Sequence, residues 1–149
     1  MTLSTHFPLE EMTRSATAQR LGIANTPTRH HYSRLITLAG ALEIVRKACG
    51  NRPVLITSGY RNPAVNEAVG GVENSAHAQA YAADFHIPPL KIYDVAVTIS
   101  QIPDFRFDQL ILESDRGVVH LSVDPQFRME VLTQPGGPGT ATMMGLVRP

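Results

Sequence analysis

The sequence predicts an α+β fold in which helices pack on a central, mostly antiparallel sheet. The expected order of elements leads to this prediction: helices come first, then short β-type runs with a helix between them, then a run of strands. Apolar and charged residues make up 43% and 17% of the chain, which is ordinary for a globular protein and argues against disorder. With 149 residues and no dividing linker or internal repeat, the chain 1–149 is expected to be a single domain.

Two segments in the first third of the chain have helical character. Residues 7–22 predict a short helix that follows a turn. Residues 32–48 predict a longer amphipathic helix, because apolar side chains recur there every three or four positions. These positions are Leu35, Leu38, Leu42 and Val45. The intervening residues 25–31 are expected to form a loop in which His30 and His31 are solvated.

The rest of the chain alternates β-type runs with breaks. The expected elements are a strand at 52–58, one or two helical turns at 63–71, a strand at 82–87, a helix at 90–102, and strands at 107–114, 118–124 and 128–134. The strands on either side of the turn "DRG" at 115–117 predict an antiparallel hairpin. The tail 134–149 is rich in turn residues and is expected to be loosely held.

Composition excludes several classes of protein. The 13 basic and 13 acidic side chains cancel, so no basic surplus points to nucleic acid. Cys49 is the single cysteine, which rules out an internal disulfide and cysteine-rich zinc sites, so any metal site must use His, Asp or Glu. The N-terminus lacks the pattern of a secretory signal peptide, and the longest apolar stretch is shorter than the ~20 residues that span a bilayer. We therefore expect a protein made in the cytoplasm, with no membrane span.

Two side chains that commonly bind metals, His77 and Asp84, lie close together in the segment "NSAHAQAYAADFHI" at residues 74–87. The other residues are mostly small, whereas a core strand would be bulkier and a solvated loop would be more polar. Small residues allow the backbone to approach a metal closely. The alternative for Asp84 is a carboxylate at a turn or strand edge, but an unpaired buried carboxylate next to Phe85 would be unfavourable, and a metal removes that objection.

A third ligand is needed, because catalytic zinc sites commonly use three protein ligands and one open position. His120 lies in the apolar strand "GVVHLSV", on the same face as Ser122, and that face could line a cleft. A lone histidine in a strand is more often a hydrogen-bonded structural residue, so this signal is weak by itself. His86, two positions after Asp84, is an alternative ligand or a group that supports the ligands.

Taken together, these motifs resemble a known family. The stretch "TSGYRNPAVNEAVGGVENSAHAQAYAADF", followed by "FDQLILES" and "GVVHLSV", is similar to the zinc D-Ala-D-Ala carboxypeptidases and related peptidoglycan endopeptidases. That group also contains lysostaphin-type enzymes and the hedgehog signalling domain, and the pattern here is most similar to its small bacteriophage-type form. The resemblance covers residues 7–133, and its core is Ser75, His77 and Asp84 followed by His120 in a late strand. It implies a hedgehog/DD-peptidase-like fold with a zinc cleft.

The resemblance also implies roles for individual residues. One Zn²⁺ per chain would be held by His77, Asp84 and His120, and it would lower the pKa of bound water toward ~7. Glu113 would be the general base that takes a proton from that water and passes it to the leaving amine. Its alternative is a solvated glutamate at the end of a strand, and Asp115 in the following turn is the rival base.

Two further residues are expected to meet the substrate. The resemblance implies that Arg61, in "SGYRNP", binds the substrate or stabilises the transition state, whereas the commoner fate of such a residue is a surface arginine. Ser75 either hydrogen-bonds the peptide substrate or caps a turn, and the sequence does not decide between the two.

The sequence departs from the family pattern at two places. Val118 and Val119 replace the tryptophan-containing sequence often found just before the late histidine, which puts the detailed shape of the cleft in doubt. Ala80 occupies a loop position where the family often has glycine, and alanine is tolerated there unless φ must be positive.

The expected function is that of a zinc metallopeptidase that hydrolyses bacterial peptidoglycan stem peptides during cell-wall degradation, as a D-Ala-D-Ala carboxypeptidase or as an endopeptidase. A phage-encoded enzyme of this kind, an endolysin or a tail-associated protein, would act on the wall after release by a separate protein or as a virion component. The alternative is a zinc-stabilised module that binds the wall or belongs to the virion without catalysis. Glu113 and Arg61 discriminate between these functions, since a peptidase requires both to face the metal.

Overall fold

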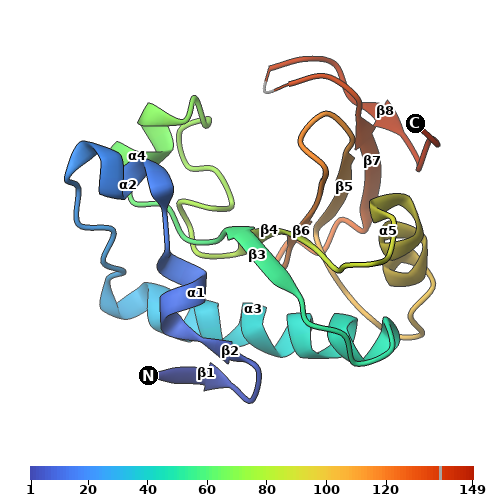
Figure 1. Ribbon diagram of the computed structural model, residues 1–149, viewed down its shortest axis with the longest axis horizontal. Coiled ribbons are helices and arrows are strands. Elements are labelled where there is room, and N and C mark those ends of the chain that lie inside the picture. Colours follow the sequence, from blue (N-terminus) through green and yellow to red (C-terminus); the bar gives the residue numbers. More distant parts are fainter. Residues whose placement is uncertain (138) are drawn as a thin grey trace.

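The computed structural model describes residues 1–137 and 139–149. A six-stranded sheet forms the centre of the molecule (Figure 1). Its strands, in spatial order, are β3 (Leu55–Ser58), β4 (Ala82–His86), β6 (Val118–Ser122), β5 (Gln109–Glu113), β7 (Glu130–Gln134) and β8 (Met143–Met144). The β5–β7 pair is parallel and the other four pairs are antiparallel. The predicted α+β fold with a mostly antiparallel sheet is confirmed, as is the hairpin of β5 and β6.

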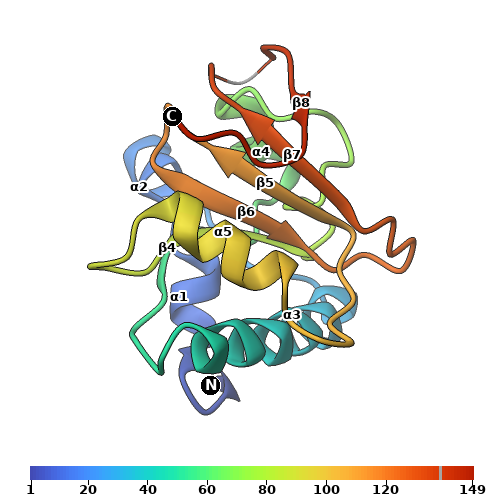
Figure 2. The same cartoon turned by 90° about the vertical axis from the view of Figure 1, so that its right-hand side faces the viewer.

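Helices cover both sides of this sheet (Figure 2). The described helices are α1 (Leu9–Thr13), α2 (Ala16–Leu21), α3 (Arg29–Ala48), α4 (Pro63–Ala68) and α5 (Ile92–Ser100). Helix α5 packs on β5 and β6, and α3 packs beneath it, whereas α4 lies on the opposite side of the sheet. A short hairpin of β1 (Thr2–Ser4) and β2 (Phe7–Pro8), which the sequence did not predict, packs near α3.

The alternation of side chains along β5 separates a core face from a cleft face. Leu110 and Leu112 are fully buried in the hydrophobic core. Gln109, Ile111 and Glu113 point to the other face and line a cleft. Burial of each leucine stabilises the fold by about 1.5–3 kcal/mol. The register of β5 is thereby fixed, because a slip of one residue would exchange the two faces.

The N-terminal segment differs from its prediction. Residues 7–22 form two helices and not one, because Arg14 takes an extended conformation (φ −64°, ψ 133°). Ser15 then begins the second helix, and its Oγ accepts a hydrogen bond from the Ala18 amide at 3.1 Å. A serine at this position competes with helix continuation by capping a new helix. Gly22 ends α2 with φ 68°, as expected.

The two histidines predicted to lie in a loop belong to α3, which begins at Arg29. His31 Nδ1 accepts a hydrogen bond from the Thr28 amide at 3.2 Å, so the pair forms a capping box. The His31 ring also packs on Tyr60, with ring centroids 4.8 Å apart. The prediction of a loop at His30 and His31 was therefore wrong, since a histidine can occupy the place that Glu or Gln usually takes in this motif. His30 is exposed, as expected, whereas His31 is partly buried.

The C-terminal tail, which the structure describes at residues 134–137 and 139–149, is more ordered there than predicted. Its strand β8 pairs with β7. Thr133 Oγ1 donates a hydrogen bond to the Gly145 carbonyl at 2.8 Å and accepts one from the Val147 amide at 2.9 Å. Polar contacts of this kind hold a segment whose sequence contains mostly turn residues. In the part of the chain that the structure describes, no helix combines the length and hydropathy that crossing a membrane requires.

Ala80 lies in the left-handed region, with φ 66°, and is fully buried in the core. This conformation costs an L-residue about 1–2 kcal/mol. The backbone at residue 80 therefore has the positive φ that makes alanine unfavourable at this position. The loop that carries His77 toward the sheet is under local backbone strain as a result.

We predict that Ala80→Gly leaves the free energy of unfolding within about 0.5 kcal/mol of the wild type, because relief of the left-handed strain offsets the lost methyl burial. Ala83→Gly is the matched control: it removes an equally buried methyl from β4 at a residue without positive φ, and should cost about 1.5 kcal/mol. Denaturant unfolding of both variants measures this difference. Equal destabilisation by the two substitutions would contradict the assignment of strain to Ala80.

Candidate metal centre

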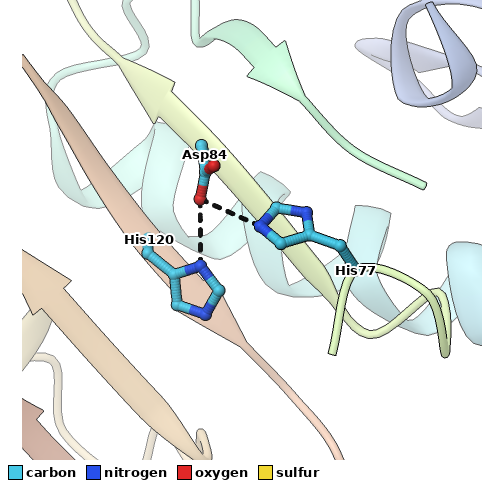
Figure 3. A group of neighbouring side chains, drawn as sticks. All are labelled: His77, Asp84 and His120. Atoms are coloured by element: carbon cyan, nitrogen blue, oxygen red, sulfur yellow. Dashed lines mark hydrogen bonds and ion pairs between the residues drawn. The ribbon is translucent and has the colours of Figure 1, made fainter. Parts of the chain in front are cut away.

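The side chains of His77, Asp84 and His120 converge at one point beside the sheet (Figure 3). Their potential ligand atoms all lie within 4.8 Å of one another. Asp84 lies on β4 directly opposite His120 on β6, because these two residues are partners in the antiparallel register. His77 reaches them from the turns that precede β4. The sheet thus positions two members of the cluster and the loop positions the third.

The loop places His77 through its own backbone. The His77 carbonyl accepts hydrogen bonds from the amides of Arg61 and Ala80, each at 3.2 Å. The imidazole Nδ1 donates to the Gly59 carbonyl at 2.8 Å. Gly59 itself must lack a side chain, since a Cβ there would collide with the carbonyl of Met12. The close approach of α1 to the end of β3 therefore holds the carbonyl that orients His77.

Hydrogen bonds within the cluster centre on one carboxylate oxygen. Asp84 Oδ1 lies 2.9 Å from His120 Nδ1 and 3.2 Å from His77 Nε2 (Figure 3). The other oxygen, Oδ2, is buried and has no hydrogen-bond partner among the described residues. Two guanidinium groups lie near Oδ2: Arg61 Nη2 at 3.6 Å and Arg116 Nη2 at 3.7 Å. A fully buried carboxylate is therefore surrounded by cationic groups without a complete set of hydrogen bonds.

Burial and charge shift the pKa values of all three residues. Burial acts to raise the pKa of Asp84, but the charge of His77 and hydrogen bonds from both histidines outweigh it and hold the pKa well below its usual range. Burial lowers the pKa of His77 despite the opposing charge of Asp84. Burial also acts to lower the pKa of His120, but the hydrogen bond and charge of Asp84 raise it overall. Asp84 is therefore ionised, and neutral imidazole is favoured at His77.

This arrangement fits a bound cation. A carbonyl only accepts hydrogen bonds, so the proton of neutral His77 resides on Nδ1, facing Gly59. In the protonated form of His77, Nε2 donates to Asp84 Oδ1 at 3.2 Å. In the neutral form the Nε2 lone pair faces that oxygen, and a cation bound by both atoms takes the place of the proton. Two imidazoles and a carboxylate are ligands that zinc uses in catalytic sites. The donor set, the unpaired Oδ2 and the orientation of His77 are all consistent with a zinc centre.

The cluster opens into a cleft of about 490 Å³. Three charged side chains line it in addition to Asp84, namely Arg61, Glu113 and Arg116. The rim also carries Val69 and Val72, which are exposed apolar residues. The site thus combines a potential metal centre, charged side chains and apolar surface, which is the composition of a ligand-binding cleft.

Glu113 lies at the end of β5, and 8% of its surface is exposed. Its Oε2 is buried and has no hydrogen-bond partner among the described residues. Burial, and next the negative charge of Asp84, raise its pKa. Asp115, the rival base, is exposed in the following turn and does not line the cleft. The geometry therefore favours Glu113 over Asp115 as the candidate general base. The alternative that Glu113 is a solvated glutamate does not fit its burial.

Arg61 and Ser75 are both cleft residues, but their own contacts differ. Arg61 is 8% exposed, and its Nε donates to Ser58 Oγ at 3.0 Å, so its terminal nitrogens remain directed toward the cluster. Ser75 Oγ donates to Asn66 Oδ1 at 2.9 Å and accepts from the Ala78 amide at 3.2 Å. Ser75 therefore caps a turn, which is one of its two expected roles, and its proton is already engaged.

The sequence analysis did not identify Arg116, Gln109 and Gln134 as cleft residues. Gln109 alternates with Ile111 and Glu113 along β5, so its face could have been predicted from Glu113. Arg116 lies in a turn, where periodicity assigns no face, and only the fold reveals its position. His86 neither joins the cluster nor lines the cleft, so the structure provides no support for it as an alternative ligand.

We predict that the wild-type protein binds about one zinc ion per chain and that His120→Ala loses this ion on dialysis, because two ligands rarely hold zinc in place of three. His86→Ala is the matched control, since it removes a histidine two residues after Asp84 on the same strand and outside the cluster. Metal analysis after dialysis provides the measurement. Stoichiometric zinc retained by His120→Ala would reject His120 as a ligand.

Comparison with known proteins places this chain in a family. A zinc D-Ala-D-Ala carboxypeptidase from Streptomyces albus G is 40% identical to the chain over 43 residues, which are 29% of this chain and 17% of that protein. The chain therefore matches less than a fifth of that relative's length. The profile of the family described as Peptidase M15 matches residues 5–122, which include the metal cluster, Arg61 and Glu113. On this match over most of its length, the chain belongs to the peptidase M15 family.

Proposed function

We propose that this protein is a zinc peptidase that hydrolyses a peptide bond in bacterial peptidoglycan stem peptides. The observation that carries the proposal is the shared cleft, in which the buried His77–Asp84–His120 cluster and the buried Glu113 line one space. Membership of the peptidase M15 family supports peptide hydrolysis. Similarity to a zinc D-Ala-D-Ala carboxypeptidase supports both the metal and the wall-peptide substrate.

His77, Asp84 and His120 would hold the zinc ion. When bound, zinc supplies a Lewis acid that polarises a carbonyl and makes water a nucleophile near neutral pH. The chain keeps these ligands in place before metal arrives, since Gly59 orients His77 and the β4–β6 register orients Asp84 against His120. Such preorganisation favours metal binding, because little conformational freedom remains to be lost.

Glu113 would act as the general base and then as the general acid. Its unpaired Oε2 is available to accept a proton from the attacking water and to donate it to the leaving amine. The raised pKa, caused first by burial and next by the charge of Asp84, suits this exchange because it makes the carboxylate a better proton acceptor. Burial excludes bulk water from this carboxylate and strengthens its interaction with the substrate.

Arg61 would stabilise the negative charge that develops on the substrate carbonyl oxygen. It is buried, permanently charged and fixed by Ser58, so its terminal nitrogens need no reorganisation during the reaction. Ser75 lines the same cleft and is proposed to contact the peptide through its oxygen, since its proton is committed to Asn66.

The alternative function is a zinc-stabilised module that binds the wall without catalysis. The position of Glu113 and Arg61 favours the peptidase, because both line the metal cleft, as a peptidase requires. A binding module has no need for a buried carboxylate oxygen such as Glu113 Oε2, which has no hydrogen-bond partner among the described residues. The proposed biological role is cell-wall degradation, and the family resemblance noted from the sequence supports a phage-type enzyme that reaches the wall after release or in the virion.

We predict that the purified protein with zinc releases new amino groups from purified peptidoglycan and that a chelator abolishes this release. The physical reason is that removal of zinc leaves no Lewis acid for the carbonyl. Amino-group quantification and mass analysis of the fragments measure the activity and identify the bond. If no wall type yields amino groups while about one zinc ion stays bound per chain, the binding-module function is preferred.

We predict that Glu113→Gln keeps its zinc but lowers kcat by about 10²–10⁴-fold, the usual contribution of general acid–base catalysis. Glutamine fills the same space but cannot accept the proton. Asp115→Asn is the matched control, because Asp115 is exposed and lies outside the cleft. Turnover is measured at equal zinc content for each variant. Full activity in Glu113→Gln together with loss in Asp115→Asn would move the base to Asp115.

A further inference from the structure

Arg116 lies in the turn between β5 and β6, and its side chain extends back along the wall of the cleft. Its Nη1 lies 3.4 Å from Glu113 Oε1, and its Nη2 lies 3.7 Å from Asp84 Oδ2. The side chain is 36% exposed. Arg116 therefore bridges the two carboxylates of the site from the solvent side of the cleft.

Arg61 and Arg116 are held differently. Arg61 is tied to Ser58 by a hydrogen bond of 3.0 Å and is 9% exposed in its side chain. For Arg116, the hydrogen bond found within the described residues is the long contact with Glu113. Arg116 is thus the more exposed and less constrained guanidinium, and it presents N–H groups to a molecule that enters the cleft.

The charges of the cleft indicate which group Arg116 would bind. Asp84 and Glu113 balance Arg61 and Arg116, and the other described lining residues apart from the histidines are uncharged. A bound divalent ion adds positive charge that these side chains do not neutralise. A metal held by Asp84 would offset the negative charge of this carboxylate, so its attraction for Arg116 at 3.7 Å weakens and the guanidinium is available for an anion. A carboxylate fits this requirement, because arginine binds carboxylates with two parallel hydrogen bonds.

The position of Arg116 beside Glu113 indicates which carboxylate of the substrate it would bind. In the proposed reaction Glu113 passes its proton to the leaving amine, so the leaving residue lies next to Glu113. The α-carboxylate of that residue is only two bonds from its amine nitrogen. A free carboxylate there would reach Arg116, whereas an internal peptide bond would offer it a neutral amide.

We propose that Arg116 is a specificity-determining residue that binds the free α-carboxylate of the residue released, so that the enzyme acts as a carboxypeptidase. This inference rests on the proposed peptidase function and extends it to the choice between terminal and internal bonds.

The test compares a stem peptide that ends in D-Ala-D-Ala as the free acid with the same peptide as its C-terminal amide. The zinc-loaded wild type should show kcat/KM about 30-fold higher for the acid, a discrimination of about 2 kcal/mol that is typical of a hydrogen bond to a charged group. Arg116→Gln should lose this preference through a higher KM for the acid, and Arg116→Lys should restore part of it. Arg106→Gln, which removes an exposed charge outside the cleft, should keep it.

Binding of the two peptides to zinc-loaded Glu113→Gln, measured by calorimetry, separates this inference from the proposed function. Turnover of acid and amide at equal rates by the wild type would overturn the inference and leave the peptidase function intact. Preferential binding of the acid that Arg116→Gln abolishes, without turnover by the wild type, would support the carboxylate site and contradict the peptidase function. Equal binding of both peptides with no turnover would overturn both.

Discussion

The ionised carboxylate of Asp84, fully buried in the middle of the sheet, is the constraint around which the site is organised. Such a charge is unfavourable in a protein interior unless cationic or hydrogen-bonding groups surround it. His77, His120, Arg61 and Arg116 approach it from separate segments of the chain. One oxygen is still without a hydrogen bond among the described residues. This oxygen can therefore take a further partner in the cleft.

The sheet separates the buried charge of Asp84 from the hydrophobic core, so the fold can contain both. One face of β5 and β6 carries leucines and valines packed under α5 and α3, while the other face carries the charged cleft. Alternation along each strand separates the two environments by the width of one backbone. The approach to the metal centre needs small residues, and there the fold accepts a strained alanine, Ala80, beside the ligand loop. Strain at a site of this kind is typical of functional loops.

In the proposed mechanism, the same charges connect metal binding with substrate recognition. Arg61 and Arg116 both lie near Asp84 Oδ2, but one is buried and fixed and the other is exposed at the cleft wall. Two residues of the same type can therefore serve different purposes, the first for charge that develops during the reaction and the second for charge that the substrate already carries. Arg116 is near enough to Glu113 to join the proposed acid–base group and the proposed carboxylate site in one surface.

Much of this could be predicted from the sequence by itself. Periodicity and element order identified the long helix, the hairpin and the α+β class, because such patterns express local geometry. The small residues around His77 and Asp84 indicated a metal-binding pair, and the resemblance to a known family implied that His120 completes it. The remaining features of the fold and the site depend on contacts between segments that are distant in the sequence. Only the tertiary structure reveals the Gly59 carbonyl that orients His77, the burial of Glu113, the ordered tail beside β7 and the position of Arg116. Side chains in a turn do not follow the regular periodicity of a helix or strand. Their neighbours therefore depend on how the whole chain folds.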